Sequence, residues 1–196
     1  IVIARHTSPD PDAIASQIAL RDAIKLTFPK KEVYAVGTSV AKFKYYGVLD
    51  RIDETTFTGD ALLIALDVPN ASRIDGVDRN AFTEFFKIDH HPSDEVFGEC
   101  DYIDESSSST CQIIIDFILD TKMKFDRKVA ENLYLGVVSD SDRFLISYTS
   151  SKTFRLVAEL IDRSNINFTE LYPYLYERPY EEIKFHGYLS SNLNIT

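Results

Sequence analysis

"ALLIALD" (61–67) is an unbroken apolar run that ends at a charged side chain, Asp67. A short run that is apolar at every position, not at alternate ones, is typical of a strand buried on both faces of a parallel sheet. Three further apolar runs of similar length are also followed by polar residues. We predict strands at "IVIA" (1–4), "EVYAVG" (32–37) and "EFFKID" (84–89).

Helical spacing of apolar residues separates these strands. In the segment 10–28, Ile14 and Ile18 fall on one face of a helix, and that face continues through Leu26. Further helices are predicted over 39–49, 107–121, 127–142, 151–164, 168–178 and 179–193. Strands that alternate with helices, followed by helices alone, predict an α/β fold: a doubly wound, mainly parallel sheet flanked by helices, with a helical C-terminal extension.

Composition excludes several classes of protein. The formal net charge of -10 argues against a surface that coats nucleic acid, because phosphate contacts need Lys and Arg. No apolar stretch approaches the ~18 residues of a membrane span, and the start of the chain does not resemble a signal peptide. The two cysteines, Cys100 and Cys111, have a spacing that fits no zinc knuckle. We therefore expect a cytoplasmic location.

Four clusters of carboxylates and histidines follow apolar elements. Each cluster alone has an ordinary explanation, such as a helix N-cap, a turn or a solvated helix end. Three of them lie at the carboxyl ends of predicted strands, which meet at one edge of a parallel sheet and bind ligands there. The clusters are "RHTSPDPDA" (5–13) with His6, Asp10 and Asp12, "DVPN" (67–70) with Asp67, "DHHPS" (89–93) with Asp89, His90 and His91, and "SDSD" (139–142) with Asp140 and Asp142.

Several carboxylates in one crevice repel each other, and burying them unpaired costs several kcal/mol each. Few basic residues are near, since Arg5 and Lys87 lie inside predicted strands and only Arg143 flanks the fourth cluster. Divalent cations are the natural compensation. Carboxylates with imidazole suit Mn²⁺ best, and Fe²⁺, Co²⁺ or Zn²⁺ are alternatives. The oxygen donors exceed the need of one tetrahedral zinc, whereas two ions ~3.5–4 Å apart would use them all. That arrangement is typical of phosphoester hydrolysis.

The four clusters resemble, motif by motif and in the same order, the DHH phosphoesterases. The segments that carry this resemblance are "HTSPDPDA" (6–13), "LDVPN" (66–70), "DHHPS" (89–93), "GVVSDSDRF" (136–144) and the serine-rich "ESSSSTCQII" (105–114). "SRIDG" (72–76) and "HHPSDEVFGE" (90–99) point to the bacterial nanoRNase/pAp-phosphatase branch.

The resemblance implies roles for individual residues. It implies two Mn²⁺ ions, one held by His6, Asp10 and Asp67 and the other by Asp12, Asp67, His90 and Asp140, with Asp67 bridging. His91 would face the substrate, and Asp89 would orient a histidine ring. Ser107, Ser108 and Ser109 open a helix and would contact phosphate, although simple N-capping is an equal alternative. Arg143 would reach a phosphate, or lie free on the surface.

The chain also departs from the family. The fourth motif often reads Asp-Thr-Gly, whereas Asp140-Ser141-Asp142 adds a charge beside the site. The family's second domain, with a Gly-rich motif, has no counterpart here. We therefore expect a catalytic domain over 1–150 and, over 151–196, a helical linker towards a domain absent from this chain. Its aromatic residues would serve packing, and a homodimer through the C-terminal part is an open alternative.

The resemblance implies Mn²⁺-dependent hydrolysis of short RNA oligonucleotides and of 3′-phosphoadenosine 5′-phosphate (pAp). Alternatives within the family are a cyclic-dinucleotide phosphodiesterase, a RecJ-like single-strand DNA exonuclease and an inorganic pyrophosphatase. The charge of -10 disfavours long DNA, which binds along a basic track. "SPDPDA" (8–13) disfavours the pyrophosphatase. A non-enzymatic metal or nucleotide sensor is a further alternative, disfavoured because no ligand is missing.

Overall fold

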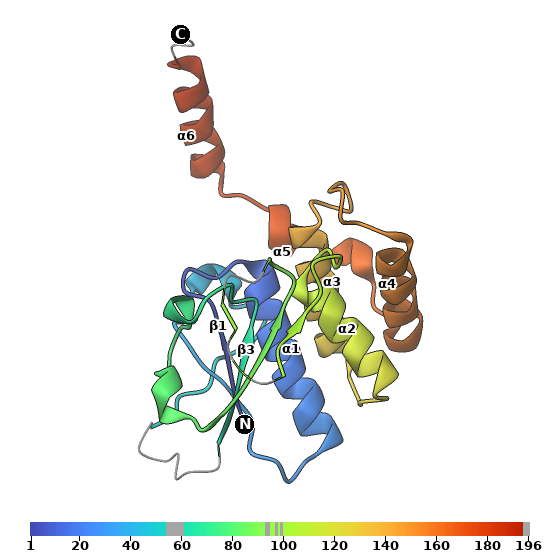
Figure 1. Ribbon diagram of the computed structural model, residues 1–196. Helices are drawn as coiled ribbons and strands as arrows, with labels where there is room; N and C mark the ends of the chain where they lie inside the picture. The colour runs from blue at the N-terminus through green and yellow to red at the C-terminus, as the bar shows by residue number, and fades with distance from the viewer. Residues whose placement is uncertain (54–60, 93–94, 97, 99, 194–196) are drawn as a thin grey trace.

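The computed structural model describes all residues except 54–60, 93–94, 97, 99 and 194–196. A five-stranded sheet, with strands in the order β2-β1-β3-β4-β5 and all neighbours parallel, forms its centre (Figure 1). Its strands are β1 (Val2–Arg5), β2 (Tyr34–Ala35), β3 (Leu62–Leu66), β4 (Glu84–Asp89) and β5 (Tyr102–Ile103). This is a doubly wound order, and its direction reverses between β1 and β3, where ligands bind in such sheets.

Six α-helices are found in the described part of the chain. They are α1 (Pro11–Thr27), α2 (Thr110–Asp120), α3 (Arg127–Asp140), α4 (Ser151–Ser164), α5 (Pro173–Tyr176) and α6 (Tyr180–Ser191). Short 3₁₀ turns supplement them at η1 (Ala41–Phe43), η3 (Ala71–Arg73), η4 (Arg79–Ala81) and η5 (Phe168–Glu170). The predicted α/β fold with a parallel sheet and a helical C-terminal extension is confirmed.

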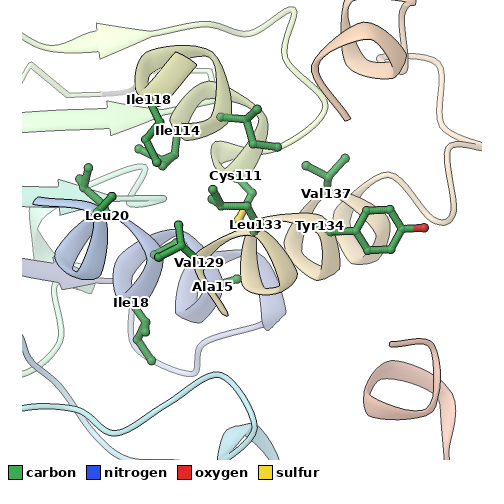
Figure 2. Packing of buried hydrophobic residues seen from close by; sticks show 14 of the residues in the cluster. Ala15, Ile18, Leu20, Cys111, Ile114, Ile118, Val129, Leu133, Tyr134 and Val137 are labelled. Carbon is green, nitrogen blue, oxygen red and sulfur yellow. The ribbon is translucent and has the colours of Figure 1, made fainter. Parts of the chain in front are cut away.

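The main core lies between the sheet and helices α1, α2 and α3. Figure 2 shows side chains of the buried cluster that these helices share, and Ile18 of α1, Ile114 of α2 and Leu133 of α3 are members of it. All three are at most 1% exposed. Burying an aliphatic side chain of this size contributes about 1.5–3 kcal/mol, so this layer fixes the helices against the sheet.

Loops and 3₁₀ turns cover the opposite face of the sheet in the described part of the chain. Val2, Ala4 and Leu63 point to that face, where Ile74 and Phe82 pack on them. Right-handed crossovers explain why helices lie on one face of the sheet and loops on the other. Connections that run in opposite directions along a parallel sheet lie on opposite faces. The segment that follows β3 therefore lies over this second face. There it contacts the residues that directly follow β1.

The predicted helix over 39–49 is wrong. Only the 3₁₀ turn η1 forms there, and Gly47 adopts φ +142°, outside the helical region. Tyr46 is buried, and its carbonyl accepts a hydrogen bond from Asn132 Nδ2 of α3 at 2.7 Å. A glycine turn and a long-range contact thus replace a helix that local spacing alone suggested.

The aromatic residues of the predicted C-terminal extension fall into two sets. Tyr172 lies near Tyr134 of α3, and Tyr174 stacks on Tyr45 with ring centroids 3.5 Å apart. Helix α6, in contrast, buries none of its residues and projects away from the body (Figure 1). The prediction that these aromatic residues serve packing is therefore confirmed for Tyr172 and Tyr174 and not for those of α6. The domain boundary at residue 150 stays a prediction. No helix in the described segments is long and apolar enough to cross a membrane.

Candidate metal centre

The predicted ligand residues converge at the carboxyl edge of the sheet, where the strand order reverses. His6 follows β1, Asp67 follows β3, and Asp89 ends β4. Asp67 adopts φ +57°, a left-handed turn held by its N–H donating to the Ile88 carbonyl at 3.0 Å. Among the residues that the structure describes, three groups of potential ligands result, and within each the ligand atoms lie within 4.8 Å of one another. The groups are His6, Asp10 and Asp67; Asp12, His90 and Asp140; and Asp67, His90 and His91.

The first group surrounds the Nε2 atom of His6. This atom lies 3.5 Å from Asp67 Oδ2 and 3.8 Å from Asp10 Oδ2. Nδ1 of the same ring lies 2.7 Å from the Thr7 carbonyl, which can only accept a hydrogen bond, so Nδ1 carries the proton. This contact therefore leaves the lone pair on Nε2, as metal ligation requires. Asp10 meanwhile caps α1, because its Oδ1 accepts the Ala13 N–H at 2.9 Å.

The second group surrounds Nε2 of His90. This nitrogen is buried and has no hydrogen-bond partner among the described residues. It lies 3.3 Å from Asp140 Oδ2 and 3.6 Å from Asp67 Oδ1. An imidazole nitrogen that faces two carboxylates without a hydrogen bond fits a divalent cation between them, since buried polar atoms otherwise find a partner. The residues present thus fit a metal.

Asp67 stands between the two groups. Its Oδ2 faces His6, whereas its Oδ1 faces His90 and His91, at 3.6 and 3.4 Å. The side chain is 1% exposed. One oxygen toward each group is the arrangement that a carboxylate bridging two cations needs.

His91 and Asp89 form a pair beside the two groups. Nδ1 of His91 lies 2.8 Å from Asp89 Oδ1, and the same oxygen accepts the His91 backbone N–H at 3.1 Å. The hydrogen bond to Asp89 raises the pKa of His91. Burial acts to raise the pKa of Asp89, but the bonds from His91 lower it. Asp89 thus orients the half-exposed His91, and its second oxygen lies 3.5 Å from the buried Lys87.

Asp12 is held by the N-terminus of α2, a contact that the sequence did not indicate. Its Oδ2 accepts the Thr110 N–H at 2.8 Å, and its Oδ1 accepts the Cys111 N–H at 2.9 Å. The Thr110 hydroxyl donates to Asp67 Oδ1 at 3.2 Å. Helix N-termini favour anions. In this site the group at the helix N-terminus is the Asp12 carboxylate. Helix α2 therefore orients Asp12 through backbone N–H groups and Asp67 through the Thr110 hydroxyl.

The serines before α2 have partners inside the protein. Ser109 is the N-cap of α2, since its Oγ accepts the Gln112 N–H. Ser107 and Ser108 donate to Asp104 and to Gln112 Oε1. None of the three is more than 2% exposed. The N-capping alternative is therefore confirmed for Ser109, and phosphate contact by these serines stays a prediction.

Arg143 and Asp142 pair with each other at the end of α3. Arg143 Nη2 lies 2.7 Å from Asp142 Oδ1, and the guanidinium lies 5.5 Å from the centre of the Tyr176 ring. Both residues have positive φ. The extra charge of Asp142 is thus neutralised locally. Contact of Arg143 with phosphate stays a prediction. Ser93, at the end of the third motif, lies outside the described residues.

Protons balance part of the charge in this cluster. Burial acts to lower the pKa of His6, but hydrogen bonds to Asp10 and Asp67 outweigh it and raise the pKa to about 10. Burial and the charges of Asp67 and Asp10 raise the pKa of Asp140 to about 7. Burial, with the charge of Asp67, raises the pKa of Asp12 well above its ordinary value. Burial lowers the pKa of His90, which favours its neutral, ligating form.

Residues 1–137 match the family described as "DHH family, N-terminal domain". This chain belongs to the DHH family. The prediction of a hydrolase that acts on phosphoester bonds is thereby confirmed at the level of the family. The family is generally metal-dependent, which agrees with the ligand groups described above, whereas the identity of the metal is a separate question.

Two bacterial relatives share 35% identity with this DHH-family chain over its full length. One is the "Bifunctional oligoribonuclease and PAP phosphatase NrnA" of Bacillus subtilis, of which the chain covers 63%. The other is the "Probable bifunctional oligoribonuclease and PAP phosphatase NrnA" of Streptococcus mutans, of which it covers 62%. The chain therefore spans less than two thirds of the length of these relatives.

Solved structures agree on the fold. An exopolyphosphatase-related protein from Bacteroides fragilis superposes with a TM-score of 0.84 at 23% identity, covering 100% of this chain and 62% of that one. A putative family II inorganic pyrophosphatase from Methanococcus jannaschii gives a TM-score of 0.66 at 18% identity, covering 89% of this chain and 61% of that one. At these identities the likeness concerns the fold alone.

Proposed function

We propose that this chain is the catalytic domain of a Mn²⁺-dependent phosphohydrolase that acts on short RNA oligonucleotides and on pAp. The observation that carries the proposal is the position of Asp67 between two ligand groups, with Oδ2 3.5 Å from His6 Nε2 and Oδ1 3.6 Å from His90 Nε2. The names of the two relatives at 35% identity supply the substrate class. Carboxylates with imidazoles and no thiolate suit Mn²⁺.

In this proposal His6, Asp10 and Asp67 hold one ion, and Asp12, Asp67, His90 and Asp140 hold the other. Two bound cations supply the positive charge that in-line displacement at phosphorus needs. The chain's own residues supply orientation and a proton. Because Asp89 engages Nδ1 of His91, the ring nitrogen left for the substrate is Nε2, which donates to a phosphate or leaving oxygen.

Residues 151–196 lead, in this proposal, toward the part of the relatives that the chain does not span. A homodimer formed through the C-terminal part stays an open prediction. Both cysteines are free thiols, which suits a reducing compartment, and we propose that the enzyme works in the cytoplasm.

The test is hydrolysis by the full-length polypeptide that contains this chain, with and without Mn²⁺. A ribodinucleotide, pAp and a cyclic dinucleotide are compared side by side. We expect Asp67→Asn to lower the Mn²⁺-dependent rate at least ~10³-fold, since both ion positions lose charge. Asp162→Asn, an exposed position on α4, is the matched control.

Each outcome decides between functions. Cleavage of only the cyclic dinucleotide would favour the phosphodiesterase alternative, and cleavage of none would favour the non-enzymatic sensor. Full activity of Asp67→Asn would show that the shared carboxylate does not organise the reaction.

A further inference from the structure

Arg73 lies beside the candidate metal centre and belongs to none of its ligand groups. It ends the 3₁₀ turn η3, six positions after Asp67. Its carbonyl accepts the Thr7 N–H at 2.7 Å, and an isolated antiparallel bridge joins Ile74 to His6. The backbone of Arg73 is therefore attached directly to the segment that carries the first candidate ligand.

Buried contacts hold the Arg73 segment in place. Asp75 forms an ion pair at 2.7 Å with Arg5, which is 0% exposed, and accepts the Thr38 N–H at the same distance. Gly76, with φ +89°, lies so close to Gly37 that a Cβ atom would stand 2.5 Å from the Gly37 backbone. This packing places Arg73 at a defined position on the edge of the site, unlike a residue on a long, unsupported loop.

The Arg73 side chain is left without an acceptor when His6 ligates a cation. Its Nη2 lies 3.2 Å from His6 Nδ1. Ligation through Nε2 requires a proton on Nδ1, and Nδ1–H then donates a hydrogen bond to the Thr7 carbonyl at 2.7 Å. Arg73 is a donor only, so it cannot also bond to Nδ1 in that state. The residue is exposed and forms no ion pair with a carboxylate of the described segments.

Other cations near the site are already engaged. Arg143 pairs with Asp142 and lies over the Tyr176 ring. Lys87 is buried, 3.5 Å from Asp89 Oδ2 and 3.3 Å from the Pro69 carbonyl. A phosphate that enters this cluster of carboxylates needs positive charge, and a guanidinium binds phosphate oxygens through two parallel N–H groups. Arg73 is the described residue that meets both requirements.

We propose that Arg73 binds the nonbridging oxygens of the substrate's phosphate, on the side of the site next to His6. The inference rests on the proposed function and deepens it, because it identifies the chain's own phosphate-binding cation. Arg73 turns from the His6 ring to the phosphate when substrate enters. Its role is substrate binding, and the backbone of its segment, not its side chain, supports the fold.

The test uses Arg73→Gln and Arg73→Lys in the full-length polypeptide, with Arg155→Gln, an exposed position on α4, as the control. We expect Arg73→Gln to lower kcat/KM for a ribodinucleotide by about 10–100-fold, mainly through KM, since a charged hydrogen bond is lost. Lysine should restore part of the loss as a point charge. Mn²⁺ affinity and melting temperature should match the wild type, as should all measurements on Arg155→Gln.

A binding measurement separates this inference from the proposed function. Calorimetric titration of the Mn²⁺-loaded protein with inorganic phosphate should give a Kd about 10-fold weaker for Arg73→Gln than for the wild type. Equal phosphate affinities would overturn the inference even if the wild type hydrolyses RNA. A variant that loses Mn²⁺ affinity but keeps phosphate affinity would also overturn it, because Arg73 would then position His6. A wild type that binds phosphate through Arg73 but hydrolyses nothing would overturn only the proposed function.

Discussion

The Asp12 carboxylate and the Thr110 backbone N–H are joined by a hydrogen bond of 2.8 Å between α1 and α2. The neighbouring Cys111 N–H donates to the other oxygen of the same carboxylate. A helix N-terminus thus orients a carboxyl group that is 1% exposed. One contact consequently links the packing of two helices to the geometry of a candidate metal ligand.

Metal should stabilise the fold through Asp12. Mn²⁺ at ~100 times its Kd should contribute about 2.7 kcal/mol of stability, which raises the melting temperature by about 5–10 °C for a chain of this length. Asp12→Asn should lose at least half of that shift, since the second ion position loses a charge. Thermal scans with EDTA and then with Mn²⁺ measure the effect. An unchanged shift in the variant would remove Asp12 from the ligand set.

Mn²⁺ affinity should rise with pH between pH 6 and 8. The pKa of Asp140 is raised to about 7 and that of His6 to about 10, so both groups must lose protons before they ligate a cation. Protons therefore compete with the metal at Asp140 below about pH 7 and at His6 up to about pH 10, and binding should release them. Calorimetry in two buffers of different ionisation enthalpy counts the protons. Asp140→Asn should flatten the pH dependence of Mn²⁺ affinity near pH 7. A wild-type affinity that does not change with pH would contradict the prediction that Asp140 and His6 are metal ligands.

Gly136→Ala should destabilise the fold by about 1–3 kcal/mol or more, as overpacking does. A Cβ at this position of α3 would stand 2.2 Å from Cys111 Sγ and 3.1 Å from Asp12 Oδ1. Urea unfolding measures the loss, and Mn²⁺ affinity should fall with it because Asp12 must move. Gly187→Ala is the matched control, since nothing lies within 4 Å of that position on α6. Equal stability of the two variants would refute the close packing of α2 on α3.

Asp75→Ala should cost about 3–5 kcal/mol, because it leaves the buried charge of Arg5 without its partner. Burial acts to raise the pKa of Asp75, but hydrogen bonds from Thr38 and Arg5 lower it below its ordinary value. The carboxylate therefore contributes stability above the unfolded-state pKa of ~3.9, and this contribution is lost as pH falls through the lower folded value. Urea unfolding of wild type and variant at pH 7 and pH 3 should show the difference shrink in acid.

Positions near strand ends could be predicted from the sequence because they depend on short-range order. An apolar run that stops at Asp67 or Asp89 indicates both a buried strand and the polar residue at its carboxyl end. The N-cap alternative for Asp10 is confirmed and leaves its role as a metal ligand a prediction, since one oxygen caps α1 and the other faces His6. Strand ends in a parallel sheet meet at one edge, so their convergence followed from the fold class.

Features that depend on contacts between distant segments could not be predicted. The hydrogen bonds from α2 to Asp12 and the position of Arg73 beside His6 leave no periodic pattern in the sequence. Strand β5 has two residues, too few for a hydrophobic pattern, and it was missed. The segment over 39–49 has helical spacing, but the fold uses Tyr46 as a buried anchor and Gly47 as a turn.

The candidate ligands come from both ends of the sheet domain, since His6 follows the first strand and Asp140 ends α3. A ribosome must release nearly the whole sheet and its three covering helices before a cation meets all of them. Until then the growing chain offers only fragments of the site, which bind a cation weakly. We therefore expect a metal ion to be acquired only after this part of the chain has been synthesised, so that metal supply affects how long the folded protein persists.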